Sequence, residues 1–172
     1  MTPRARSGRA RRIRLLVLDV DGVLTDGRLV YGTGGEETKV FHVRDGYGIV
    51  AALASGLDVA VVSGRASRAV ESRLAELGVT EVHQRIADKA ALLGDVCARR
   101  SIAPDLVAYM GDDMPDLPLM RRVGLALAPA DAVPEVRRAA HWISRRPGGA
   151  GAVREAIEWL LRARAAWPPP SA

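Results

Sequence analysis

The sequence predicts an α/β fold: a three-layer, doubly wound and mostly parallel sheet with helices on both faces. Short apolar runs, such as residues 15–18 and 57–62, are typical of strands buried on both faces of a parallel sheet. Segments with helical periodicity separate these runs. Polar residues follow three of the runs, at Asp19, Ser63 and Asp112. Because right-handed crossovers bring the carboxyl ends of parallel strands to one edge, we expect these side chains near one another.

The first half of the chain contains a hairpin and two helices. Two β-prone runs flank the glycine-rich residues 32–36, which predicts a protruding β-hairpin over about residues 28–42. A helix is expected at 44–56, where a serine and a glycine end it. The helix expected at 66–77 has one apolar face and a glycine, Gly78, just past its end.

The second half repeats the alternation of strands and helices. The periodicity and the positions of glycine and proline predict the following elements: strands at 79–83, 106–110, 124–128 and 141–143, and helices at 88–100, 116–122, 131–139 and 150–165. We expect no large cap domain, since only the hairpin and one helix separate Asp21 from Ser63.

Length and composition indicate a single domain. The 172 residues suffice for one core, which we expect at residues 13–165, between a disordered arginine-rich tail at 1–12 and a proline-rich tail at 166–172. No apolar run approaches the ~20 residues that span a bilayer, and residues 1–12 lack the apolar part of a secretory signal. We therefore expect a cytoplasmic protein without membrane contact. The only cysteine, Cys97, excludes an internal disulfide.

The basic residues are unevenly distributed. Six arginines lie in residues 1–14, and without them the net charge of +5 becomes −1, which argues against a nucleic-acid partner. Nearly all basic residues are arginine, and the only lysines are Lys39 and Lys89. Either these two positions require a compact ammonium rather than a planar guanidinium, or the bias is chance.

A set of polar residues is predicted to gather at the carboxyl edge of the sheet: Asp19, Asp21, Ser63, Lys89, Asp112, Asp113 and Asp116. Oxygen ligands without histidine or cysteine favour a hard cation, with Mg²⁺ the first choice. A carboxylate beside a metal and a lysine is what phosphoryl transfer requires. Each residue alone has a structural explanation, such as a helix cap for Ser63 or a surface position for Lys89.

The ordered set resembles the four motifs of the haloacid dehalogenase (HAD) phosphatase superfamily: Asp19-Val20-Asp21-Gly22, Ser63, Lys89 and Gly111-Asp112-Asp113-Met114-Pro115-Asp116. The resemblance implies that Asp19 is a nucleophile that forms an aspartyl-phosphate. It implies that Asp21 is the general acid and then the base. The implied magnesium ligands are Asp19, the backbone carbonyl of Asp21, and Asp112. Asp113 and Asp116 would be supporting acids, and Ser63 and Lys89 would hold the phosphoryl group.

Longer segments resemble one capless family within that superfamily, the 3-deoxy-D-manno-octulosonate 8-phosphate (KDO 8-phosphate) phosphatases. They are residues 19–27, 35–48, 63–65 and 146–155, within a resemblance that covers residues 15 to about 162. It implies Mg²⁺-dependent hydrolysis of a sugar acid phosphate, KDO 8-phosphate, to KDO and phosphate in lipopolysaccharide precursor synthesis. It also implies a homotetramer joined through the hairpins, in which a neighbouring subunit helps to close the active site. A hairpin packed on its own domain is the alternative.

A sugar acid phosphate carries a carboxylate that needs a partner. Arg65, which follows Ser63 and Gly64, and Arg73, beside an apolar helix face, are candidates for bidentate contact, although either side chain could instead extend into solvent. One residue departs from the resemblance: Arg85 stands where the family usually has glycine, which could narrow the pocket or add a cation.

Three other functions remain open at this point. A related HAD phosphatase could act on a nine-carbon sugar acid phosphate or on a broader set of sugar phosphates. A phosphoacceptor receiver domain uses similar residues, but there the phosphorylated aspartate lies on a middle strand, apart from the acidic pair. A catalytically silent assembly subunit would not need an intact Asp21.

Overall fold

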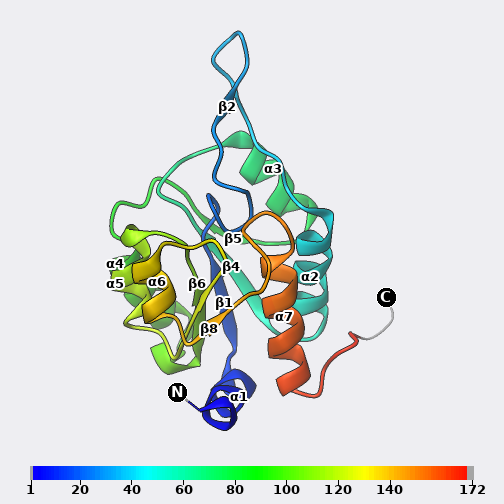
Figure 1. The fold of residues 1–172 in the computed structure, drawn as a ribbon, viewed down its shortest axis with the longest axis vertical. Coiled ribbons are helices and arrows are strands. Elements are labelled where there is room, and N and C mark those ends of the chain that lie inside the picture. Colours follow the sequence, from blue (N-terminus) through cyan, green and yellow to red (C-terminus); the bar gives the residue numbers. More distant parts are fainter. Residues whose placement is uncertain (1, 170–172) are drawn as a thin grey trace.

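The computed structural model, which describes residues 2–169, has a six-stranded parallel sheet between two layers of helices (Figure 1). The strand order is β5-β4-β1-β6-β7-β8, and every pairing in this sheet is parallel. The strands are β1 (Leu15–Leu18), β4 (Asp58–Val62), β5 (Glu81–His83), β6 (Val107–Met110), β7 (Leu125–Ala128) and β8 (Trp142–Ile143). The predicted doubly wound α/β fold is confirmed.

Helices cover both faces of the sheet. They are α1 (Pro3–Arg12), α2 (Val43–Ala54), α3 (Arg68–Glu76), α4 (Lys89–Arg100), α5 (Leu117–Met120), α6 (Pro134–Ala139) and α7 (Ala152–Ala163). The central strand β1 is fully buried, and its alternate residues serve two apolar clusters. Leu16 and Leu18 pack with α1, α2, α3 and α7, whereas Leu15 and Val17 pack with α4, α5 and α6.

The hairpin protrudes from the body of the molecule (Figure 1). Its antiparallel strands β2 (Val30–Tyr31) and β3 (Glu37–Thr38) pair over only two residues each. The hairpin lies within the predicted segment 28–42, and its regular part is shorter because little of it packs on the sheet. Leu29, Val30, Tyr31 and Val40 stay exposed.

The N-terminal segment differs from the prediction. Residues 1–12 were expected to be a disordered tail, but Pro3–Arg12 forms α1, whose first turn is capped by the Thr2 hydroxyl. Ala10 and Ile13 are buried in the core next to α7. The helix forms because these two apolar residues dock on the domain, which outweighs the repulsion between its arginines.

Smaller differences concern element ends. The helix predicted at 116–122 is a 3₁₀ turn at Met114–Asp116 followed by the short α5, since Asp113 and Asp116 form a reciprocal cap there. The helix predicted at 131–139 starts only at Pro134. In the predicted proline-rich tail, Ala166 and Trp167 pack against the core, and residues 170–172 lie outside the described residues. Among the described helices, none has the length and apolarity to cross a bilayer.

Candidate active site

The first acidic motif sits where β1 ends. Asp19 is 7% exposed, and its backbone N–H donates to the carbonyl of Met110 on the neighbouring strand. The chain then turns sharply at Gly22, which has a φ of +81°. A Cβ atom at Gly22 would overlap the Asp112 carboxylate and would be strained at this φ, so glycine is favoured between the two acidic loops.

Lys89 reaches Asp19 from the start of α4. Its side chain is 8% exposed, and Nζ lies 2.9 Å from Oδ1 of Asp19 and 2.7 Å from Oδ1 of Asp116. Burial alone would lower the pKa of Lys89, but the charges of the two carboxylates outweigh it and raise this pKa. The ammonium therefore stays charged. Asp88 accepts the N–H groups of Ala90 and Ala91, which offsets the unfavourable position of a cation at a helix start.

Asp116 organises this corner of the site. It is 1% exposed, and each of its oxygens accepts two hydrogen bonds. Oδ1 accepts from Lys89 and from the Tyr109 hydroxyl, at 2.7 and 2.6 Å, and Oδ2 accepts from the backbone N–H groups of Asp112 and Asp113, at 2.9 and 3.2 Å. Because all these donors are fixed, Asp116 holds Lys89 and the Asp112 loop in place.

Sequence reasoning missed Tyr109. Its position in the apolar run 106–110 indicated a core residue, and the ring is indeed fully buried on β6. The signal that would identify it is the hydroxyl, because a buried tyrosine needs a polar partner. Burial, and then the charge of Asp116, raise the pKa of Tyr109 well above its usual range, so its hydroxyl stays protonated and donates a hydrogen bond to Asp116.

The acidic cluster carries more negative charge than its protein partners neutralise. Carboxylate oxygens of Asp19, Asp112 and Asp116 all lie within 4.8 Å of one another. Burial and the charge of Asp116 raise the pKa of Asp19 to about 6, although Lys89 opposes the shift. Burial and the charges of Asp116 and Asp19 raise the pKa of Asp112 to about 7. Such mutual repulsion among oxygen donors is what a divalent cation relieves, so the residues fit Mg²⁺.

The carboxylates of the cluster differ in how many hydrogen bonds they accept. Both oxygens of Asp116 are occupied, whereas the Asp112 carboxylate accepts no hydrogen bond from the described residues. Within the same part of the chain, the backbone carbonyl of Asp21 also accepts none. Beside Asp19, the Asp112 carboxylate and the Asp21 carbonyl are therefore available to a cation within this part of the chain.

Ser63 lies at the exit of β4, the strand next to β1. It is 3% exposed, its backbone N–H donates to the carbonyl of His83, and its hydroxyl accepts the N–H of Arg65 at 3.1 Å. Gly64 follows in an exposed turn. Ser63 therefore sits at the predicted sheet edge, on a loop tied to β5.

The Asp21 side chain contacts the hairpin instead of the buried cluster. Its Oδ1 lies 2.5 Å from Nζ of Lys39, and its Oδ2 lies 3.8 Å from Nε of Arg65. Arg65 in turn pairs with Glu37 at 2.7 Å and donates to the Tyr31 hydroxyl at 3.2 Å. The hairpin thus supplies the side chains of Lys39, Glu37 and Tyr31 to the surroundings of Asp21 and Arg65.

Two predicted site residues lie apart from the carboxylate cluster. Arg73 pairs with Glu76 at 3.0 Å, and its guanidinium packs against Gly46 of α2. Among the described residues, it forms no hydrogen bond or ion pair with Asp19 or Asp21, since the helix face that carries it turns toward α2. Asp113 is exposed and caps the N–H of Met114, although its charge contributes to the raised pKa of Asp112.

Arg85 adopts a left-handed backbone conformation, with a φ of +60°. This conformation costs a residue with a side chain roughly 1–2 kcal/mol relative to glycine, which gives a physical reason for glycine at this position. The Arg85 side chain is exposed and forms no hydrogen bond or ion pair with a described residue. It adds a cation near the loop of Arg65, whose carbonyl accepts the Arg85 N–H at 3.3 Å.

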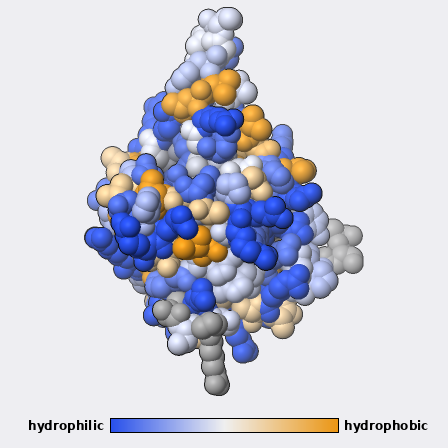
Figure 2. Space-filling model, viewed as in Figure 1, coloured by the Kyte–Doolittle hydropathy of each residue, from blue (hydrophilic) through white to orange (hydrophobic). Residues whose placement is uncertain are grey.

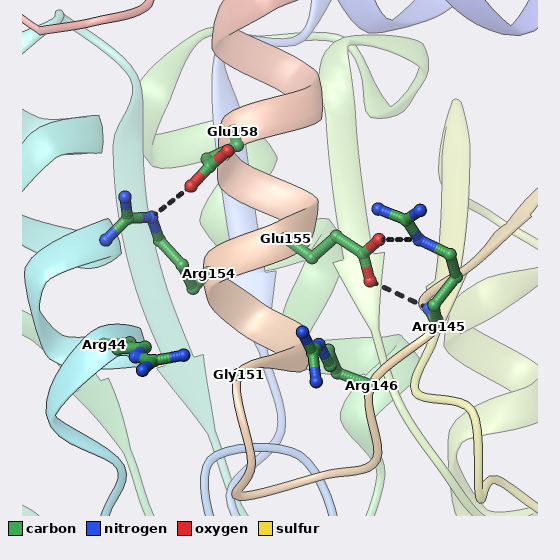
Figure 3. Close-up of a pocket in the computed structure, with 7 residues that line it drawn as sticks. All are labelled: Arg44, Arg145, Arg146, Gly151, Arg154, Glu155 and Glu158. Atoms are coloured by element: carbon green, nitrogen blue, oxygen red, sulfur yellow. Dashed lines mark hydrogen bonds and ion pairs between the residues drawn. The ribbon is translucent and has the colours of Figure 1, made fainter.

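A separate hollow of about 410 Å³ lies between the starts of α2 and α7 (Figure 3). Its lining consists of Arg44, Arg145, Arg146, Gly151, Arg154, Glu155 and Glu158. Glu155 pairs with Arg145 and Glu158 pairs with Arg154, each at 2.6 Å. The acidic cluster does not line this hollow, so the hollow is separate from the predicted active site.

Comparisons with known proteins agree with the fold. A haloacid dehalogenase-like hydrolase family model matches residues 76–157. The KDO 8-phosphate phosphatase of Escherichia coli K12 is 49% identical over 156 residues, which cover 91% of this chain and 83% of that protein. The chain belongs to the KDO 8-phosphate phosphatase family. It is therefore a HAD-type phosphatase.

Solved structures of this family superpose closely on the chain. The KDO 8-phosphate phosphatase from Yersinia pestis has a TM-score of 0.92 at 44% identity, over 94% of this chain and 87% of that one. The enzyme from Moraxella catarrhalis, solved with magnesium, phosphate and KDO, has a TM-score of 0.94 at 36% identity, over 96% and 95% of the two chains. The magnesium in that relative agrees with the donor set of the acidic cluster here.

Proposed function

We propose that this phosphatase hydrolyses KDO 8-phosphate to KDO and phosphate through an aspartyl-phosphate on Asp19. The observation that carries the proposal is the buried Asp19, which Lys89 holds at 2.9 Å within an acidic cluster, in a chain 49% identical to a phosphatase of that substrate. Asp19 would attack the phosphorus, and the bond to the sugar oxygen would break.

Each side chain has a distinct task in this reaction. Lys89 would bind the phosphoryl oxygens while it keeps Asp19 oriented, and Ser63 and the N–H groups at Gly64 would bind the same group from the neighbouring strand. Asp21 would protonate the leaving sugar oxygen and then accept a proton from the water that hydrolyses the aspartyl-phosphate. Bound Mg²⁺ would supply charge neutralisation that lets the anionic nucleophile approach the phosphate.

We infer that Arg65 and Arg73 recognise the substrate carboxylate. Arg65 supports this best, because its guanidinium lies beside Asp21, where the sugar leaves. Arg73 is more distant and would act at the far end of the sugar or on a neighbouring subunit's substrate. A carboxylate would compete with Glu37 for Arg65, since both are planar partners for a guanidinium.

We further propose a cytoplasmic homotetramer joined through the hairpins, acting in lipopolysaccharide precursor synthesis. Apolar residues gather at the base of the hairpin (Figure 2), and the exposed ones along the hairpin and α2 are Leu29, Val30, Tyr31, Val40, Val43, Tyr47 and Val50. Exposed apolar residues grouped in this way are typical of subunit interfaces. Light scattering at micromolar concentration tests this; a monomer would contradict it.

A substrate panel tests the proposed activity. KDO 8-phosphate, a nine-carbon sugar acid phosphate and neutral hexose phosphates would be assayed for phosphate release with Mg²⁺ and with EDTA. We expect the highest kcat/KM with KDO 8-phosphate and no turnover in EDTA. Higher kcat/KM with the nine-carbon acid would identify the alternative substrate, and no turnover of any sugar phosphate would contradict the proposal. Arg65→Ala should lower the preference for acids over neutral sugars.

A further inference from the structure

Lys39 and Lys89 are the only lysines among 25 basic residues, and the structure places each beside one carboxylate of the first motif. Nζ of Lys89 lies 2.9 Å from Asp19, and Nζ of Lys39 lies 2.5 Å from Asp21. A compact ammonium makes a point contact with one carboxylate oxygen, whereas the larger guanidinium needs room for its planar fork. The shared placement gives a physical reason for lysine at these two positions.

The Lys39 side chain is buried more deeply than its partners. It is 2% exposed, whereas the side chains of Asp21 and Glu37 are 24% and 12% exposed. Its ammonium lies between these two carboxylates, at 2.5 and 3.3 Å. Removing such a charge from water costs several kcal/mol that only close pairing repays, so its position is strongly determined by Asp21 and Glu37.

We propose that Lys39 is a positioning residue that fixes the Asp21 carboxylate for proton transfer and so couples the hairpin to the reaction. The proposal rests on the function proposed above, in which Asp21 protonates the leaving oxygen. Asp21 lies in the turn after β1, where no strand pairing restrains its side chain. Lys39 follows β3, so the restraint comes from the hairpin.

The geometry argues that Lys39 acts through Asp21 and not on the substrate itself. With 2% of its side chain exposed, Lys39 has almost no surface left to contact a bound sugar. Arg65, by contrast, is 44% exposed at the same place and offers its guanidinium to a ligand. The two cations around Asp21 therefore differ in role: Arg65 is accessible to a ligand, and Lys39 contacts the carboxylate from the buried side.

Two substrates with different leaving groups test this role. KDO 8-phosphate releases an alkoxide that must be protonated, whereas p-nitrophenyl phosphate releases a stable anion. The value of kcat/KM reports the first chemical step, in which the leaving group departs. For Lys39→Met we expect kcat/KM to fall about 100-fold with the alkyl phosphate, because general acid catalysis contributes roughly 10²–10⁴-fold to the rate. With the aryl phosphate, which does not need the general acid, we expect kcat/KM to fall at most about threefold.

A double variant separates positioning from substrate contact. If Lys39 acts through Asp21, adding Lys39→Met to Asp21→Asn causes no further loss in the alkyl-to-aryl ratio of kcat/KM. Arg28→Met is the matched control, because it removes an 84% exposed cation near the same hairpin base and should leave both rates unchanged. Lys39→Gln, which keeps a hydrogen-bond donor, should recover part of the ratio.

The results that would overturn the proposal are distinct from failure of the proposed function. Equal losses with both substrates would indicate a merely structural role, and additive losses in the double variant would indicate contact with the sugar; either overturns it. If the wild type hydrolysed p-nitrophenyl phosphate but not KDO 8-phosphate, the proposed substrate would be wrong. The ratio would then be measured with whichever primary alkyl phosphate the enzyme accepts, and it would still decide the role of Lys39.

Discussion

The two carboxylates of the first motif lie one residue apart, yet they depend on different regions of the molecule. Asp19 contacts Lys89, which Asp116 and Tyr109 hold within the sheet and α4. Asp21 contacts Lys39 and Arg65, which are tied to the hairpin. The proposed nucleophile therefore belongs to the folded core, whereas the proposed proton donor depends on the protruding hairpin. Disturbing either region should therefore produce a different defect.

The largest effect is expected from Asp19→Asn. Removing the nucleophile should lower kcat by at least about 10⁴-fold with every substrate, because no other group can form the covalent intermediate. Phosphate release with KDO 8-phosphate and p-nitrophenyl phosphate measures this. Asp26→Asn, an exposed acid close in sequence, should keep wild-type rates. Equal residual activity in the two variants would contradict the assignment of the nucleophile.

Tyr109→Phe tests the core region that supports Asp19. It deletes one hydrogen bond to the buried charge of Asp116 without changing the ring. A hydrogen bond to a charged group contributes about 1.5–3 kcal/mol, so the free energy of unfolding should fall by about that amount. Activity should fall by similar factors with alkyl and aryl phosphates, since Lys89 and Asp19 serve both. Urea denaturation and kinetics together measure this, and a selective loss with the alkyl phosphate would contradict it.

Glu37→Gln tests the hairpin region that surrounds Asp21. It removes the second carboxylate that holds Lys39 and the one that holds Arg65. We expect about a tenfold lower kcat/KM with the sugar acid phosphate, a smaller change with p-nitrophenyl phosphate and a lower melting temperature, because the buried Lys39 ammonium loses one of its two carboxylate partners. Equal losses for both substrates would contradict a role of Glu37 at Asp21 and Arg65.

The smallest expected effect is a dependence of stability on pH in the metal-free protein. The pKa values of Asp19 and Asp112 rise from 3.8 to about 6 and about 7, chiefly through burial and through the neighbouring carboxylate of Asp116. The folded protein then binds more protons than the unfolded chain between about pH 4 and 7, so its free energy of unfolding falls as the pH rises through that window.

Magnesium should reverse this trend. At pH 8 both carboxylates are ionised, and saturating Mg²⁺ at about ten times its Kd should add about 1.4 kcal/mol of stability. Thermal melts in EDTA and in Mg²⁺ at pH 5 and pH 8 measure both effects. Asp112→Asn should flatten the pH dependence and remove the response to Mg²⁺. Metal-free wild type that grew more stable from pH 5 to pH 8 would contradict the crowded arrangement of the cluster.

The sequence predicted the core region of the site well, for a local reason. Asp19, Ser63 and Asp112 each follow an apolar run, and a parallel sheet has one carboxyl edge, so the order of elements alone gathers them. The same reasoning did not establish how Arg73 lies relative to the acidic cluster, because helix periodicity gives the face of a residue but not the direction of a long side chain. It failed for residues 1–12, where the docking of Ala10 and Ile13 was not visible in an arginine-rich composition.

The sequence by itself therefore determined the α/β fold, the sheet edge and the chemistry gathered there. The tertiary structure decided which group supports which: Asp116 is held by Tyr109 and two backbone N–H groups, and Asp21 is held by Lys39. The physical reason is distance along the chain. Apolar periodicity is a local property of neighbouring residues, whereas an ion pair between residues 18 positions apart depends on where the hairpin folds back onto the sheet.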